Sequence, residues 1–188
     1  MIPLPRWPSE NTPRSNSLST KQDISIRPLE DVPVGSGIFV DINIFVYHLL
    51  EDELYGARCR DFLKRAETGS LVAFTSPIVA SETLFIYLRA WVIQNKKIAP
   101  KRVLRYLKRH RAVLKEVDFH KPLALLSLLR VLPINKGIMQ TSYSLMTRYQ
   151  LLPADSIEAA LIQRHGLPAL ATRDDDFDDV DGLDVYKP

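Results

Sequence analysis

Four acidic residues stand where predicted strands end or predicted helices begin. Asp41 directly follows the apolar run 38–40, and Asp174 comes two residues after the end of a second apolar run. Glu82 and Asp155 lie near the starts of two predicted helices. In an open α/β sheet, ligands bind beyond the carboxyl ends of the parallel strands. Because the two helices begin close to the same edge, we expect the four acids to converge there.

Carboxylates that converge need a positive charge between them. Without a cation, neighbouring carboxylates repel one another and raise each other's pKa. Ligation by acidic oxygens alone suits the hard cations Mg²⁺ and Mn²⁺, which retain waters and contact substrate phosphates. The four acids therefore indicate a divalent metal site whose natural substrate is a phosphodiester.

Each acid also has an ordinary structural explanation. Asp41 can cap a helix, and Glu82 can be a solvated helix residue. Asp155, with Glu158 three residues later, fits a capping box. The aspartates between positions 174 and 181 are typical of a solvated loop. Only the combination of the acids favours a metal site.

Strands and helices that alternate along the chain must position these acids. Short apolar runs predict buried strands, and apolar residues at helical spacing predict the helices between them. The predicted strands cover residues 38–40, 71–74, 131–134, 169–172 and 183–186. The predicted helices cover residues 44–50, 55–66, 101–115, 119–129, 138–149 and 155–165, and a further one opens at Thr75-Ser76-Pro77. This alternation indicates a parallel sheet covered on both faces.

The composition fits one globular domain. The chain has 188 residues, of which 46% are hydrophobic and 25% charged. Its single cysteine, Cys59, excludes an internal disulfide and indicates a cytoplasmic protein. No apolar stretch approaches the roughly 20 residues that cross a bilayer, so we expect no membrane span. Residues 1–34, rich in Pro, Ser, Thr and Asn, predict a flexible tail before a folded domain at 35–188.

Positive charge is concentrated between residues 89 and 121. Eleven Lys and Arg residues lie there against two acids, although the whole chain carries only +3. Phosphate contacts from basic side chains give affinity for nucleic acid that does not depend on sequence. The predicted RNA-binding residues are Lys101, Arg102, Arg105 and Lys108, with Tyr87, Trp91 and Tyr106 as surfaces on which bases could stack. The alternative is a solvated helix whose aromatic residues belong to the core.

The four acids lie in segments that resemble the PIN domains, and most closely the VapC-like toxin ribonucleases. The resemblance runs from Gly37 to Tyr186. The segments are Phe39-Val40-Asp41-Ile42-Asn43, Thr75-Ser76-Pro77 through Glu82, Leu152-Pro153-Ala154-Asp155 through His165-Gly166-Leu167-Pro168, and Thr172-Arg173-Asp174-Asp175-Asp176-Phe177. Four segments in the family's order and spacing are more specific than any one of them. The sequence departs from a compact toxin in its N-terminal segment and in its long basic stretch.

The resemblance implies a PIN-like three-layer fold, with a central parallel sheet of four to five strands flanked by helices. It also implies metal-dependent hydrolysis of single-stranded RNA, in which Mg²⁺ or Mn²⁺ is held by carboxylates. The expected ligands are Asp41, Glu82, Asp155 and Asp174, with Asp176 as a further acid and Asn43 and Thr172 as groups that orient them. A homodimer and a cognate antitoxin protein are the expected partners.

Other functions remain open at this point. A haloacid-dehalogenase-like phosphatase also places Asp after the first strand, but it needs a second acid where this chain has Asn43. An RNA-processing nuclease that is not a toxin would carry the same acids. A non-catalytic PIN-like module that binds RNA or protein would bind RNA equally well with and without metal.

Three adjacent aspartates are distinguished by the geometry of an extended chain. Side chains along a strand alternate between its two sides. Thr172, Asp174 and Asp176 should therefore share one side, while Arg173 and Asp175 point to the other. We expect only the first set to face the acidic site.

Overall fold

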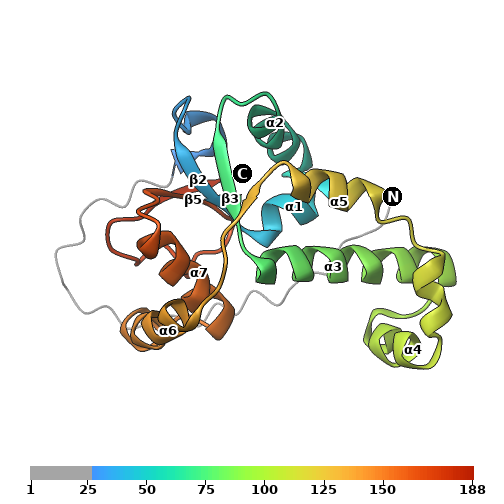
Figure 1. Ribbon diagram of the computed structural model, residues 1–188. Helices are drawn as coiled ribbons and strands as arrows, with labels where there is room; N and C mark the ends of the chain where they lie inside the picture. Colours follow the sequence, from blue (N-terminus) through green and yellow to red (C-terminus); the bar gives the residue numbers. More distant parts are fainter. Residues whose placement is uncertain (1–26) are drawn as a thin grey trace.

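The computed structural model describes residues 27–188, and their strands form one parallel sheet (Figure 1). The six strands, in the spatial order β1-β6-β5-β2-β3-β4, are β1 (Arg27–Pro28), β2 (Gly37–Val40), β3 (Val72–Thr75), β4 (Arg130–Val131), β5 (Ala169–Ala171) and β6 (Asp184–Lys187). β2 pairs with β3 on one side and with β5 on the other. The strand order therefore reverses at β2, and the carboxyl ends of β2 and β5 form the crevice where open α/β sheets bind ligands.

Helices cover both faces of the sheet. They are α1 (Ile42–Leu49), α2 (Gly56–Glu67), α3 (Pro77–Lys96), α4 (Val103–Arg109), α5 (His120–Ser127), α6 (Lys136–Tyr149) and α7 (Pro153–Arg164). α1 and α2 lie on one side of the strands, and α6 and α7 pack together on the other (Figure 1). None of the described helices is both long and apolar enough to span a membrane. The predicted α/β class is confirmed.

The sequence explains why the central elements form. Ile38, Phe39 and Val40 of β2 are fully buried, as expected for a parallel strand covered on both faces. Ser76 caps α3, because its hydroxyl oxygen accepts the Val79 N–H at 3.1 Å. Pro77 follows at the first helical position, where its missing N–H leaves no helical hydrogen bond unmade.

The sheet has one strand more than the expected four to five, and the folded part begins before residue 35. β1 pairs with β6, and a 3-10 turn, Leu29–Asp31, follows it. Leu29 and Val32 are 1% and 2% exposed. The prediction of a flexible tail is therefore wrong for residues 27–34. The sequence did not indicate β1, because a strand of two residues is too short to show a periodic pattern and its partner, β6, is distant in the sequence. Residues 1–26 lie outside the described part of the chain.

The predicted basic helix 101–115 is also wrong as a single element. It is divided into a 3-10 turn (Pro100–Arg102), α4 and a second 3-10 turn (Arg111–Lys115), with a non-helical backbone at His110. Like charges three and four residues apart destabilise a helix, and this segment has many such pairs. The predicted strand 131–134 is likewise reduced to β4. Pro133 cannot donate to a sheet ladder.

A second, smaller core holds α4 against the far end of α3. Its buried members are Leu88, Val92, Val103, Val113 and Val117, all outside the main core. In Figure 1 this unit projects from the sheet at the end of α3. The long helix α3 therefore joins the carboxyl edge of the sheet to a separate basic arm, defined as residues 97–117.

The buried contacts of residues 27–34 predict a stability effect. Leu29→Ala should lower the free energy of unfolding by about 2–5 kcal/mol, because truncating a buried leucine leaves a cavity. Urea denaturation measures it. Val34, at 80% exposed, is the matched control. Val34→Ala should change stability by less than about 0.5 kcal/mol. Equal effects of the two substitutions would show that residues 27–34 do not pack on the domain.

Candidate metal centre

Asp41 is fixed at the junction of β2 and α1 by hydrogen bonds to both oxygens. Its Oδ1 accepts the backbone N–H of Ile42 at 2.5 Å. Its Oδ2 accepts a hydrogen bond from Asn43 Nδ2 and another from the Thr172 hydroxyl, each 2.6 Å long. Because Thr172 follows β5, these bonds join the carboxyl ends of two neighbouring strands. The Asp41 side chain therefore caps α1 and also links the end of β2 to the segment after β5.

The same network folds the segment after β5 around Asp41. The Thr172 hydroxyl oxygen accepts from Asn43 Nδ2 and from the Asp174 N–H, both at 2.9 Å. Asn43 Oδ1 accepts the Arg173 N–H at 3.0 Å. Asp174 Oδ1 then accepts the Asp176 N–H at 2.9 Å. Side-chain acceptors thus set the positions of both aspartates.

Asp155, Asp174 and Asp176 form the tightest group of acids. One carboxylate oxygen from each lies within 4.8 Å of the others, and all three side chains are half-buried. Asp155 is in the first turn of α7, where the helix dipole favours a negative charge. Three oxygens at this separation fit Mg²⁺ or Mn²⁺, which bind through a few carboxylates and keep their remaining positions for water and phosphate.

Glu82 lies at the margin of this group. It is in the second turn of α3, and its side chain is exposed. It is not among the three acids whose oxygens meet, although its charge contributes to the raised pKa values of Asp41 and Asp155. The structure therefore brings Glu82 near the site without placing it in the closest cluster.

Asp175 points away from the acids on either side of it. Its Oδ1 accepts hydrogen bonds from Lys187 Nζ at 2.6 Å and from Arg173 Nη1 at 3.2 Å. The hydrogen bond from Lys187 lowers the pKa of Asp175 below its usual value, and burial only partly opposes it. The separation of Asp175 from Asp174 and Asp176 agrees with the predicted alternation, although the chain turns here.

Burial and like charges raise the pKa of the inward-facing acids. Burial is the main cause of the pKa of about 6 at Asp41, and the hydrogen bonds from Thr172 and Ile42 partly offset it. The pKa of Asp155 rises to about 7, first through burial and then through the charges of Asp174 and Asp41. A site that opposes its own ionisation in this way favours a bound cation.

Glu158 lies in a position that the sequence pattern did not predict. The alternative explanation of Asp155 and Glu158 as a capping box does not hold, because Leu152 is the N-cap of α7 and makes no side-chain cap bond. Glu158 instead is 2% exposed, and burial, followed by the charges of Asp41 and Asp155, raises its pKa well above the usual value. Its spacing of three residues from Asp155 was the available signal, because such residues share a helix face.

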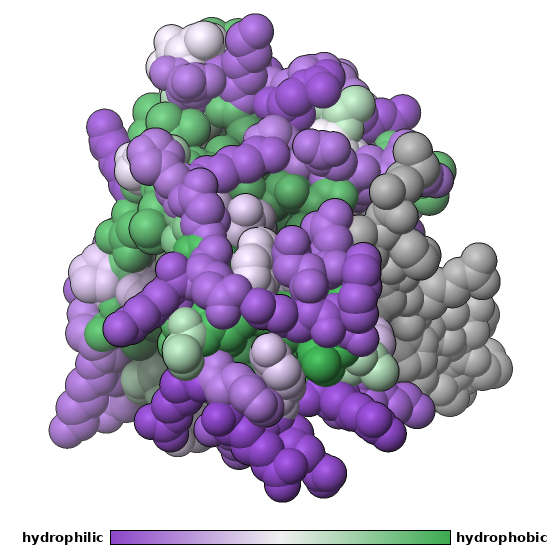
Figure 2. All heavy atoms as spheres, turned by 90° about the vertical axis from the view of Figure 1, so that its right-hand side faces the viewer, coloured by the Kyte–Doolittle hydropathy of each residue, from purple (hydrophilic) through white to green (hydrophobic). Residues whose placement is uncertain are grey.

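The predicted RNA-binding residues lie on the basic arm, away from the acids. Lys101, Arg102, Arg105 and Lys108 are all exposed. From the side of α4, the surface is mostly hydrophilic, with hydrophobic residues between the charged ones (Figure 2). The three aromatic residues, Tyr87, Trp91 and Tyr106, pack against the second core and are only partly exposed. The geometry thus favours a core role for them over stacking on bases.

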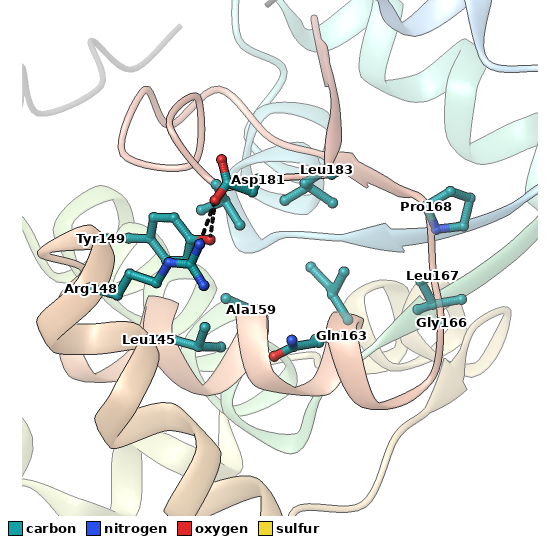
Figure 3. Close-up of a pocket in the computed structure, with 13 residues that line it drawn as sticks. Leu145, Arg148, Tyr149, Ala159, Gln163, Gly166, Leu167, Pro168, Asp181 and Leu183 are labelled. Atoms are coloured by element: carbon teal, nitrogen blue, oxygen red, sulfur yellow. Dashed lines mark hydrogen bonds and ion pairs between the residues drawn. The ribbon is translucent and has the colours of Figure 1, made fainter. Parts of the chain in front are cut away.

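A separate cavity of about 320 Å³ lies between α6, α7 and the segments before β5 and β6. None of the predicted metal ligands lines it. Arg148 and Tyr149 both donate to Asp181 Oδ2 across its mouth, at 2.8 and 2.9 Å (Figure 3). These two hydrogen bonds give Asp181 a structural role at the cavity, outside the metal centre.

The chain matches the PIN domain over residues 38–183 and therefore belongs to the PIN domain family. It is 30% identical over 150 residues to Ribonuclease VapC2 of Methanocaldococcus jannaschii, covering 80% of this chain and 93% of that protein. It is 24% identical over 153 residues to Ribonuclease VapC6 of the same organism, covering 81% and 97%. Among solved structures, it is similar to VapBC2 from Rickettsia felis bound to a promoter DNA fragment, with 16% identity, a TM-score of 0.49 and coverage of 80% and 98%.

The raised pKa of Asp155 predicts how metal-free stability depends on pH. In the folded state the pKa of Asp155 is about 7, whereas its usual pKa is 3.8. Between these two pH values the folded state binds more protons than the unfolded state, so the free energy of unfolding falls as pH rises. Asp155→Asn should remove this part of the fall. Melting temperatures at pH 5 and pH 8, in the presence of a chelator, measure it.

Asp175→Asn is the control for this comparison. The pKa of Asp175 is lowered from 3.8, so its contribution is complete above that pH and is lost only below it. Its substitution should leave the difference between pH 5 and pH 8 unchanged. If Asp155→Asn keeps the full wild-type difference, Asp155 is ionised throughout this range in the folded protein.

Proposed function

We propose that this chain is a metal-dependent endoribonuclease that hydrolyses phosphodiester bonds in single-stranded RNA. The observation that carries the proposal is the meeting of oxygens from Asp155, Asp174 and Asp176 within 4.8 Å, beside the anchored Asp41. Membership of the PIN domain family and the ribonuclease names of two relatives support the same activity.

The proposed roles of the residues follow from their positions. Asp155, Asp174 and Asp176 hold a divalent cation, and Asp41 and Glu82 complete the negative wall around it. When bound, Mg²⁺ or Mn²⁺ supplies an electrophile for phosphoryl oxygens and lowers the pKa of water. Asn43 and Thr172 keep Asp41 oriented through the hydrogen bonds that reach its Oδ2.

The partners form the finer part of the proposal. The sequence resemblance to VapC-like toxins supports a cognate antitoxin that inserts a segment into the acidic pocket, and a homodimer in the cytoplasm. A solved structure from Klebsiella pneumoniae with 23% identity, a TM-score of 0.46 and coverage of 79% of this chain and 95% of that chain is a toxin–antitoxin complex. A binding module without a working site remains distinguishable, because its RNA binding would not require metal.

Adjacent aspartates give the sharpest test of the activity. The protein is incubated with a mixed single-stranded RNA pool, with and without Mn²⁺, and product formation is followed. Asp174→Asn should nearly abolish cleavage and Asp176→Asn should reduce it, because both remove a carboxylate from the cluster. Asp175→Asn should stay close to wild type, because Asp175 is paired with Lys187.

The folding of each variant is checked by circular dichroism. Cleavage by the wild type without divalent metal, or no cleavage under either condition, would overturn the proposed activity. Equal losses in the three variants would mean that the acidic run acts only through its summed charge. Asp174 would then be withdrawn as a ligand.

The basic arm provides a second test. Replacing Lys101, Arg102, Arg105 and Lys108 by Glu should weaken RNA binding, because fewer counterions are released on association. The plot of the logarithm of the RNA association constant against the logarithm of salt concentration has a negative slope. This slope should become less steep by roughly 0.7 for each RNA phosphate that the variant no longer neutralises. Fluorescence anisotropy across a salt series measures this. Mn²⁺ affinity is the control and should not change. An unaltered salt slope would show that RNA enters elsewhere.

A further inference from the structure

Glu158 is a carboxylate in the interior of the domain. It lies in the middle of α7, and only 2% of the residue is exposed. The next four residues, 159–162, are buried Ala, Ala, Leu and Ile. An apolar side chain would complete this buried stretch at no electrostatic cost, whereas an ionised carboxylate is strongly destabilised there unless a positive charge accompanies it. Glu158 therefore needs a partner.

The described residues supply no such partner. Within residues 27–188, Glu158 Oε2 has no hydrogen-bond partner, and Glu158 forms no ion pair with Lys, Arg or His. The charged groups that act on it most strongly are all acids, namely Asp41, Asp155, Glu82 and Asp174. The protein itself thus surrounds this carboxylate with negative charge.

The helix directs Glu158 towards the acidic site. Residues three apart on an α-helix lie on the same face, one turn from each other. Asp155, three residues earlier, contributes an oxygen to the cluster with Asp174 and Asp176. Glu158 therefore lies one turn further along α7 than Asp155, on the buried side of the helix, where the charges of Asp41 and Asp155 act on its carboxylate. Its oxygens are not among the three that meet within 4.8 Å.

We propose that Glu158 is a further metal-holding residue, whose carboxylate ligates a divalent cation from the buried floor of the acidic site. The cation supplies the positive charge that the chain lacks at this position, and a carboxylate oxygen is a ligand that Mg²⁺ and Mn²⁺ accept. The inference rests on the proposed function, because it requires that the site takes a metal. It goes further by adding an acid that the family resemblance did not mark as a ligand.

Direct metal titration tests the proposal. Isothermal titration calorimetry of the full chain with Mn²⁺ compares wild type, Glu158→Gln and Asp179→Asn. Glutamine keeps the shape of the side chain and removes its charge. Glu158→Gln should weaken Mn²⁺ binding at least about tenfold, the lower end of the effect for residues that support a metal site. Asp179 is on the same acidic loop as Asp174, and its substitution controls for a general loss of negative charge.

Thermal melting provides a second readout that does not need cleavage. Glu158→Leu should raise the melting temperature of the metal-free protein, because a buried carboxyl group with an unpartnered oxygen is replaced by an apolar group. The increase in melting temperature on adding Mn²⁺ should be smaller in Glu158→Gln and Glu158→Leu than in wild type. Circular dichroism confirms that both variants are folded.

The outcomes separate this proposal from the proposed function. If wild type binds Mn²⁺ and cleaves RNA, and Glu158→Gln binds Mn²⁺ with unchanged affinity and stoichiometry, only the role of Glu158 is overturned. Glu158 is then a neutral buried acid. If wild type binds no Mn²⁺, both proposals fail together. Equal weakening by Asp179→Asn would reduce the effect to summed charge and would also overturn the assignment.

Discussion

Repulsion among carboxylates gathered at one edge of the sheet is the constraint on which the site depends. The acids differ in how far hydrogen bonds offset this repulsion. Asp41 receives hydrogen bonds from Ile42, Asn43 and Thr172. Burial raises its pKa to about 6, and the hydrogen bonds from Thr172 and Ile42 oppose that rise. At Asp155, burial and neighbouring charges are the main causes, and the pKa reaches about 7. Fixed donors thus hold Asp41 in place, whereas burial and the neighbouring acids oppose the ionisation of Asp155.

The topology explains why such an unfavourable group can form at all. The crevice lies where the strand order reverses, so acids that follow β2 and β5 meet without any contact between them being favourable in itself. The free energy that stabilises this arrangement comes instead from the burial of apolar side chains, which includes those of β2 and β5. A cation bound there would stabilise the folded state in addition to any chemical role, because it binds only the assembled site.

Local patterns in the sequence predicted most of this arrangement. The apolar run 38–40 marked β2, Ser76-Pro77 marked the start of α3, and the alternation of side chains separated Asp175 from its neighbours. What failed depends on distant contacts or on orientation. β1 is two residues long and pairs with β6 at the other end of the chain. The burial of Glu158 follows from which face of α7 turns inward, and that is decided by packing.

The distance between the basic arm and the acids has an electrostatic consequence. The arm packs on α3 from Leu88 onward, and Leu88 lies about 9 Å along the helix axis from Glu82 at 1.5 Å per residue. Charges in solvent are largely screened past about 8 Å at physiological salt. The arm therefore does not neutralise the carboxylates or displace a cation from them. In the proposed function, one part of the chain attracts the phosphates of RNA while the other keeps the negative charge that a metal requires, and α3 separates the two.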